Sequence, residues 1–217
     1  MIYNIYKPVD CTSFDVVKKI RSITKEKKVG HGGTLDPFAE GVLIIGTGKD
    51  TKSLTEISGT VKSYRAILKL GEKTETMDNE GPVIEKRTIP DLTTDFIHSV
   101  IKDFKGKYTH IPPMFSAKRI YGVRLYKLAR QNKTVERKPV TVRIEQIDLN
   151  TFDGEYIDFS ATCSKGTYIR VLGQDIAEKL GTIGHLVKLV RTRVGEHHIE
   201  ESVPIKIFKT SWMSTAH

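Results

Sequence analysis

The chain has 217 residues, of which 38% are hydrophobic, with a net charge of +9 and two cysteines. This length and apolar content suffice to bury a core, as one large domain or one domain with an appendage. The two cysteines exclude a disulfide framework, no Cys/His cluster predicts zinc, and no apolar run approaches the ~18 residues needed to cross a bilayer. The first residues have no basic stretch followed by an apolar one, so we expect no secretory signal. We therefore expect a soluble, cytoplasmic protein without a metal.

The positive charge lies in two blocks. Residues 107–138 carry nine Lys or Arg against one acid, a net charge of +8, and residues 18–28 carry six against one, a net charge of +5. The rest of the chain has a net charge of −4. Because cations hold phosphates and aromatic rings stack on unpaired bases, the blocks favour looped or single-stranded RNA over an anionic membrane. The aromatic residues of the larger block are Tyr108, Phe115, Tyr121 and Tyr126.

The first third of the chain predicts both strands and helices. Residues 2–6 predict a short strand, and a capping box of Thr12-Ser13 with Asp15 predicts the start of a helix. The continuous apolar run 41–45 predicts a buried strand. Alternation over 62–71 predicts a further strand, with one face formed by Tyr64, Ala66, Leu68 and Leu70.

The middle of the chain continues this mixture. Residues 91–104 predict a helix with apolar residues spaced by four, namely Leu92, Phe96, Val100 and Phe104. Residues 106–139 predict a projecting basic insertion with a short helix near 123–131. Asp153-Gly154 predicts a type I′ hairpin turn between two strands.

The last third predicts a helix over 170–180 that stops at Gly181. Residues 185–195 predict a short helix that runs into a strand, and a mixed tail with Trp212 follows. Mixed helices and strands with antiparallel hairpins predict an α+β fold.

The segment 29–39, VGHGGTLDPFA, holds one carboxylate between a glycine-rich bend and a proline. Its glycines match neither the dinucleotide fingerprint nor the P-loop. Pro37 keeps Asp36 out of helical geometry, so the carboxylate lies on a tight loop, either as a turn cap or as a reactive group. A reactive role needs a nearby cation, and CSKGTYIR offers Arg170.

Five ordered motifs carry a family resemblance that spans residues 2–200. They are YKPVDCTS (6–13), GHGGTLDPFAEGVLIIGTGKDTK (30–52), KSYRAILKLGEKTETMDNEG (62–81), IPPMFSAKRIYGVRLYKLAR (111–130), and CSKGTYIRVLGQDIAEKLG (163–181) with HLVKLVRTRVG (185–195). Together they resemble pseudouridine synthases of the bacterial TruB family, which modify the T-loop uridine of tRNA. Asp10 and Asp50 depart from the family pattern outside the catalytic group.

The resemblance implies a pseudouridine synthase fold, which is α+β with a central mixed, mainly antiparallel sheet flanked by helices and loops. It implies a catalytic domain over residues 1–200, within which residues 106–139 form a thumb that grips RNA. Residues 201–217 are expected to be a tail without a PUA-type module. The expected partner is the T-stem-loop of tRNA, bound by a monomer without an obligatory protein partner, membrane, cofactor or metal.

The resemblance also implies roles for individual residues at the positions that match the family's motifs. The resemblance implies that Asp36 is the essential carboxylate and that Arg170 forms the ion pair that orients it. Tyr64 is expected to stack on the target uracil and to take the C5 proton. His31 matches the histidine that packs among the flipped T-loop nucleotides.

Supporting positions of the pocket match Lys7, Tyr168 and Leu189, and the thumb contributes Lys118 and Arg119. Taken alone, Tyr168 and Leu189 also fit ordinary core packing, as does Tyr64. Lys7 taken alone fits a surface lysine with a buried stem.

The implied reaction isomerises uridine 55 of tRNA. The C1′–N1 bond breaks, the uracil turns and a C1′–C5 bond forms, after the base is flipped out of the tRNA elbow. Asp36 either attacks C6 or assists departure at C1′ through a glycal-like intermediate. The alternatives are a non-catalytic RNA-binding or RNA-folding protein, a base-flipping hydrolase, a methyltransferase, and a synthase with a guide RNA.

Overall fold

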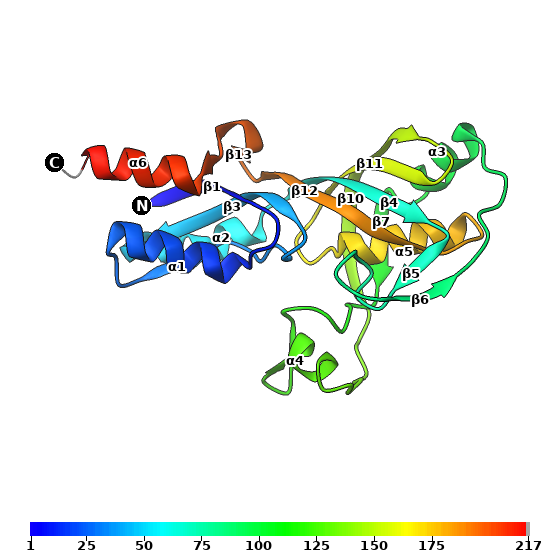
Figure 1. The fold of residues 1–217 in the computed structure, drawn as a ribbon, viewed down its shortest axis with the longest axis horizontal. Coiled ribbons are helices and arrows are strands. Elements are labelled where there is room, and N and C mark those ends of the chain that lie inside the picture. Colours follow the sequence, from blue (N-terminus) through cyan, green and yellow to red (C-terminus); the bar gives the residue numbers. More distant parts are fainter. Residues whose placement is uncertain (216–217) are drawn as a thin grey trace. The chain divides into compact units, whose positions relative to one another are not determined.

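The computed structural model describes residues 1–215. The chain forms two compact units, which we call the N-terminal unit (Met1–Arg65 with Leu189–His217) and the central unit (Ala66–Lys188). Figure 1 labels the elements of both.

The N-terminal unit contains a mixed sheet with helices packed on it. Its elements are β1 (Ile2–Lys7), α1 (Ser13–Thr24), β2 (Val29–His31), β3 (Glu40–Thr47), η1 (Gly48–Lys52), α2 (Leu54–Gly59), β13 (His197–His198), η2 (Ile199–Glu201), β14 (Val203–Pro204) and α6 (Ile205–Thr215), and it shares β4 (Lys62–Leu70) and β12 (Gly184–Val194) with the central unit. The strand order is β14-β1-β3-β12, with β2 also paired to β3 and β13 to β12. β3 is antiparallel to β1 and parallel to β12.

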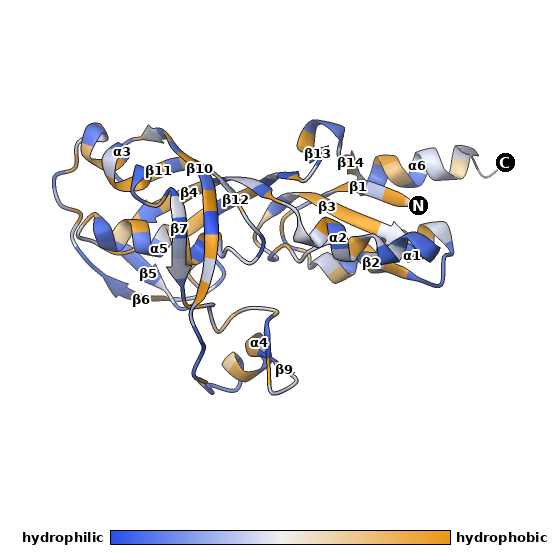
Figure 2. Ribbon diagram, turned by 180° about the vertical axis from the view of Figure 1, so that it is seen from behind, coloured by the Kyte–Doolittle hydropathy of each residue, from blue (hydrophilic) through white to orange (hydrophobic). Residues whose placement is uncertain are grey.

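Strand β3 is apolar on both faces because both faces are covered. Val42 and Ile44 belong to a cluster with Leu54 of α2, whereas Leu43 and Ile45 belong to a cluster with α1 and α6. These four strand residues are completely buried, and Figure 2 colours the strand as mostly hydrophobic. The predicted buried strand is confirmed and is longer than predicted.

The predicted start of α1 is also confirmed. The N–H of Asp15 donates to Thr12 Oγ1 at 3.1 Å, and the N–H of Thr12 donates to Asp15 Oδ2 at 3.2 Å. These reciprocal bonds satisfy two donors at the helix start. The helix buries Val16, Val17 and Ile20 on one face.

Residues 205–215, expected within a mixed tail, form helix α6. The ring of Phe208 lies 4.9 Å from that of Tyr3 on β1, and the ring of Trp212 lies 6.3 Å from it. Because these contacts join the two ends of the chain, local periodicity does not predict the helix.

The central unit combines a sheet with flanking helices. Its elements are β5 (Glu72–Thr74), β6 (Val83–Lys86), α3 (Thr94–Lys102), β7 (Gly106–His110), β10 (Val140–Phe152), β11 (Tyr156–Cys163) and α5 (Ile169–Lys179). The strand order is β12-β4-β11-β10-β7, and β10 is antiparallel to both neighbours. The predicted α+β class with mainly antiparallel strands is confirmed.

The thumb leaves the sheet at its edge. β7 pairs with β10 up to His110 and Val140, so residues 106–110 belong to the sheet and residues 111–139 project from it (Figure 1). The projecting part contains β8 (Arg119–Ile120), β9 (Val123–Arg124) and α4 (Leu125–Ala129). Helix α4 lies within the range 123–131 in which the sequence predicts a short helix.

Three local predictions are wrong. Residues 185–188 belong to β12 instead of a helix, because β12 pairs along the sheet as one continuous strand. Helix α3 is shorter than 91–104, and Phe96 is 46% exposed because Ile97, Val100 and Ile101 form the buried face.

The third error concerns the turn of the β10–β11 hairpin. The hairpin exists, but a type I′ turn needs positive φ at both central residues. Gly154 has a φ of 103°, and Asp153 is not among the residues with positive φ. Instead, Asp153 Oδ1 accepts hydrogen bonds from the N–H groups of Glu155 and Tyr156, at 3.1 and 2.7 Å.

Candidate active site

Asp36 lies, partly exposed, on the loop between β2 and β3. Gly33, three residues earlier, has a φ of 123°, which residues with a Cβ rarely adopt. The carbonyl of Asp36 accepts a hydrogen bond from the N–H of Ala39 at 3.2 Å, which closes a short turn over Pro37. The sequence therefore predicts this tight loop correctly.

Hydrogen bonds fix the loop on both sides of Asp36. Ser13, which is 2% exposed, bonds both backbone groups of Leu35: Oγ accepts from the N–H at 2.8 Å and donates to the carbonyl at 3.0 Å. On the other side, the carbonyl of Pro37 accepts a bond from the N–H of Asp10 at 3.0 Å. A backbone fixed in this way gives its side chain the preorganisation that a catalytic group requires.

Lys7 also holds the loop. Its side chain is completely buried, and Nζ donates to the carbonyls of Pro8, Cys11 and Pro37 at 2.8, 2.7 and 3.2 Å. The interpretation of Lys7 as a surface lysine is therefore wrong. Carbonyl oxygens replace the water that a buried ammonium loses. The bond to Pro37 connects this cation to the residue that follows Asp36.

Arg191 on β12 holds the glycine-rich end of the same loop, and no motif predicts this. It is 1% exposed, and its guanidinium donates to the carbonyls of Val42, Thr34 and Gly33 at 2.7, 3.2 and 3.2 Å. Gly41 permits the close approach of β3 to β12, because a Cβ there would lie 2.3 Å from the Arg191 carbonyl oxygen. The one signal in the sequence is its position within the motif 185–195.

Tyr64 lies on β4, whose alternating burial confirms the predicted strand. It is 9% exposed and shares the buried face predicted for it. Burial restricts the ring to a fixed orientation, which fits both core packing and a residue that stacks on a base. The other members of this face are Ala66, Leu68 and Leu70.

Arg170 lies in the first turn of α5 in the central unit and is 3% exposed. Nη1 donates to the carbonyl of Thr76 at 2.7 Å, Nη2 donates to the carbonyl of Phe115 at 2.8 Å, and Asp78 Oδ2 lies 3.3 Å from Nη1. Asp78 is itself 1% exposed and accepts the N–H of Glu80 at 3.0 Å. Arg170 therefore joins a buried carboxylate to the base of the thumb. Asp78 lies within the motif 62–81, but its spacing along the chain does not predict this partner.

Tyr168 lies directly before α5, in contact with an aromatic row. Its ring centroid is 5.8 Å from that of His110, which in turn stacks on Tyr108 at 5.1 Å. The Tyr108 hydroxyl donates to Asp175 of α5. Burial raises the pKa of both Tyr108 and Asp175. Because the ordinary pKa of a phenol lies far above that of a carboxyl group, the phenol keeps its proton and acts as the donor.

The remaining candidates lie in different places. Leu189 is 5% exposed on β12, Lys118 is partly exposed, and Arg119 is exposed on the thumb hairpin. By unit, the N-terminal unit contains Lys7, His31, Asp36, Tyr64 and Leu189, and the central unit contains Lys118, Arg119, Tyr168 and Arg170.

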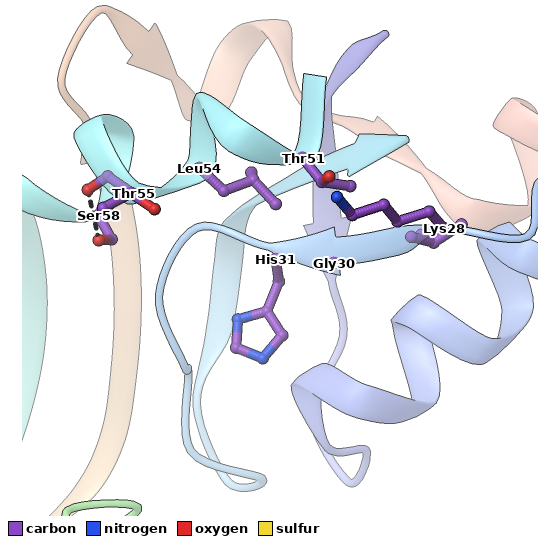
Figure 3. A pocket seen from close by; sticks show the side chains of 8 residues that line it. Lys28, Gly30, His31, Thr51, Leu54, Thr55 and Ser58 are labelled. Carbon is purple, nitrogen blue, oxygen red and sulfur yellow. Dashed lines mark hydrogen bonds between the residues drawn. The ribbon is translucent and has the colours of Figure 1, made fainter. Parts of the chain in front are cut away.

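A pocket of about 410 Å³ lies beside His31 in the N-terminal unit, between β2 and the η1–α2 segment (Figure 3). Figure 3 shows the Lys28 amino group near Thr51 at one end of it. A cation with neighbouring hydroxyls suits a phosphate or a ribose. The pocket is lined by Lys28, Val29, Gly30, His31, Thr51, Leu54, Thr55 and Ser58.

Within residues 1–215, no group of three or more His, Cys, Asp or Glu side chains is arranged to hold a metal ion. None of the helices described there has the length and apolar character to span a membrane.

Comparison with known proteins gives consistent matches. Residues 21–169 match the TruB family pseudouridylate synthase (N terminal domain). The chain is 44% identical to tRNA pseudouridine synthase B of Clostridium tetani, covering 94% of this chain and 71% of that protein. It is 42% identical to the protein of the same name from Dehalococcoides mccartyi, covering 93% and 67%.

Two solved structures are also similar over the whole of this chain. The archaeal box H/ACA sRNP Nop10-Cbf5 complex matches with a TM-score of 0.73 and 26% identity. A Cbf5-Nop10-Gar1 complex matches with a TM-score of 0.75 and 27% identity. This chain spans only 55% and 56% of those two chains.

The α+β fold and the matches over most of the chain identify a pseudouridine synthase. The chain belongs to the TruB family of pseudouridylate synthases.

Proposed function

We propose that this protein isomerises uridine 55 in the T-loop of tRNA to pseudouridine. The observation that carries the proposal is the loop of Asp36, which Ser13, Lys7 and Arg191 hold through bonds of 2.8–3.2 Å to the flanking backbone. A turn cap needs no such support, whereas a catalytic carboxylate does. The relatives named tRNA pseudouridine synthase B support tRNA as the substrate.

The proposed chemistry is intramolecular. The C1′–N1 bond of the uridine breaks, the uracil turns, a C1′–C5 bond forms, and the C5 proton moves to N1 of the product, so no atoms are gained or lost. Asp36 acts as the essential carboxylate, at C6 of the base or at C1′. Arg170 serves as its orienting cation, and Tyr64 stacks on the uracil and takes the C5 proton.

Binding is proposed to involve residues of both units. His31 packs among the flipped T-loop nucleotides, and the adjoining pocket takes the RNA backbone through Lys28. The thumb holds phosphates through Lys118 and Arg119. Lys7, Tyr168 and Leu189 support the base pocket, Lys7 from within the fold through its bond to Pro37.

We further propose that the protein acts in the cytoplasm as a monomer, without an obligatory protein partner. The two solved structures named above are of complexes. Size-exclusion chromatography with light scattering, with and without tRNA, tests this part of the proposal.

The test of the reaction uses purified protein and a synthetic T-stem-loop RNA, with carbodiimide labelling because the isomer has an unchanged mass. We expect labelling at the T-loop uridine with the wild type and a rate lower by more than about 10³-fold with Asp36→Asn. Asp91→Asn, at an exposed position before α3, is the matched control and should retain the wild-type rate. RNA binding without any product from the folded wild type would favour a non-catalytic RNA-binding protein.

A further inference from the structure

The tip of the thumb has an unusual residue in its turn. β8 and β9 pair through Arg119 with Arg124 and through Ile120 with Val123, so the turn consists of two residues. These are Tyr121, with a φ of 50°, and Gly122, with a φ of 79°. Positive φ at both positions defines the type I′ geometry, which favours Asn, Asp or Gly. A tyrosine at the first position destabilises the turn.

The Tyr121 ring gains nothing from packing in return. The residue is 97% exposed, the most exposed of the large hydrophobic residues in the described chain. The base of the hairpin is nevertheless well fixed. Leu125 is completely buried, its N–H donates to the carbonyl of Lys118 at 2.8 Å, and the N–H of Tyr126 donates to the carbonyl of Ser116 at 3.1 Å. The hairpin therefore presents a solvated ring on a strained turn, and its base is fixed by burial and hydrogen bonds.

The charged residues next to the ring along the chain are all positive. Arg119 and Arg124 flank the turn on its two strands, and both are exposed. No Asp or Glu occurs in residues 107–135. An exposed ring among cations suits an unpaired nucleotide, whose base stacks on the ring while its phosphates meet the cations. An acidic protein partner would contact the cations but would not need the exposed ring. A membrane surface would need a larger apolar face than one ring provides.

We propose that Tyr121 is a stacking platform for an unpaired RNA base other than the target uridine. A ring that is 97% exposed covers only one face of a base and cannot exclude water. It therefore cannot enclose the base that reacts. The thumb hairpin would thus recognise a second exposed nucleotide and favour looped RNA over plain duplex. This inference rests on the proposed function only in taking RNA as the partner.

The test compares Tyr121→Phe, which keeps the ring, with Tyr121→Asn, which suits the turn and removes it. Binding is measured by fluorescence anisotropy with two probes, a labelled T-stem-loop and a blunt duplex of equal length. We expect Tyr121→Asn to weaken binding of the stem-loop about 5- to 150-fold and to leave duplex binding unchanged, since stacking contributes that much per base. Tyr121→Phe should bind both probes like the wild type.

Thermal unfolding serves as the control for folding. Because asparagine relieves the strained turn, Tyr121→Asn should unfold at the same or a higher temperature than the wild type, so that weaker binding is not a folding defect. Unchanged stem-loop binding by this variant would overturn the proposal, as would an equal loss on both probes.

Product formation separates this inference from the proposed function. If the wild type forms pseudouridine but Tyr121→Asn binds the stem-loop as tightly as the wild type does, the stacking platform is overturned and the enzyme activity is not. Selective binding that depends on Tyr121, without product, supports the platform and contradicts the enzyme activity.

Discussion

His110 illustrates how burial controls a single residue. It is 4% exposed, stacked on Tyr108 and in edge contact with Tyr168, at the last pair before the thumb. Burial lowers the pKa of His110 below its usual value of 6.5, the charge of Lys118 lowers it further, and the backbone of Gly166 opposes this only in part. The imidazole is therefore held neutral between two aromatic rings.

This predicts a loss of stability in mild acid. Because the pKa is lower in the folded state, the unfolded state takes up the proton first as pH falls. The contribution of His110 is complete above about pH 6.5 and declines as pH falls from there toward the folded pKa. We expect the free energy of unfolding of the wild type to fall between pH 7.5 and 5.5 relative to that of His110→Phe.

Urea unfolding at several pH values measures this difference. His110→Gln is the second variant, since it also lacks a titrating ring but keeps a polar group. The free energy of unfolding should depend on pH in the same way for the two variants, although its absolute value should differ between them. The same acid-induced loss in the wild type and both variants would show that another group is responsible.

At the scale of elements, Arg191 connects strand β12 to strand β3 and to the loop of Asp36. Replacing it with methionine removes the donors to three backbone carbonyls, of which that of Val42 is buried. We expect Arg191→Met to lower the free energy of unfolding by about 2–4 kcal/mol. We also expect kcat to fall more than KM rises, because the loop loses its fixed geometry.

The matched control is Lys209→Met, an exposed position on α6 in the same unit. It should change the free energy of unfolding by no more than about 0.5 kcal/mol. Denaturant unfolding and steady-state kinetics on the T-stem-loop measure both variants. Full activity of a destabilised Arg191→Met would show that the bond network supports the fold but not the site.

Elements are predictable where local pattern and tertiary contact agree. The capping box is sufficient to predict the start of α1, and the alternation is sufficient to predict β4, because each pattern acts within a few residues. Part of β12 is mistaken for a helix, since short apolar runs fit both periods. The burial of Lys7 cannot be predicted from local pattern, because one of its three acceptors, Pro37, lies 30 residues away. The role of Arg191 depends on a still longer separation, 149 residues from Val42.

For the whole molecule, the distribution of charge predicts salt-dependent binding. The basic block of residues 107–138, which includes most of the thumb, has a net charge of +8 within a chain of net charge +9. Each phosphate that the protein neutralises releases counterions, so log Kd should rise linearly with log salt. We expect the double variant Arg119→Gln and Arg124→Gln to reduce this slope by about 0.7–0.9 for each phosphate that is no longer neutralised.

Lys206 and Lys209 on α6 provide the matched control, because both are exposed cations outside the two basic blocks. Replacing both with glutamine should leave the slope unchanged. An equal decrease in slope for the two double variants would mean that total charge, and not the thumb, determines binding. Anisotropy titrations from about 50 to about 200 mM salt distinguish these outcomes.

The sharing of β4 and β12 between the units restricts how this protein can be divided. Tyr64 and Leu189 lie at the points where these strands pass from one unit to the other. Any excision of residues 66–188 cuts both strands next to those two residues. Neither unit can therefore be transplanted or exchanged as an intact module.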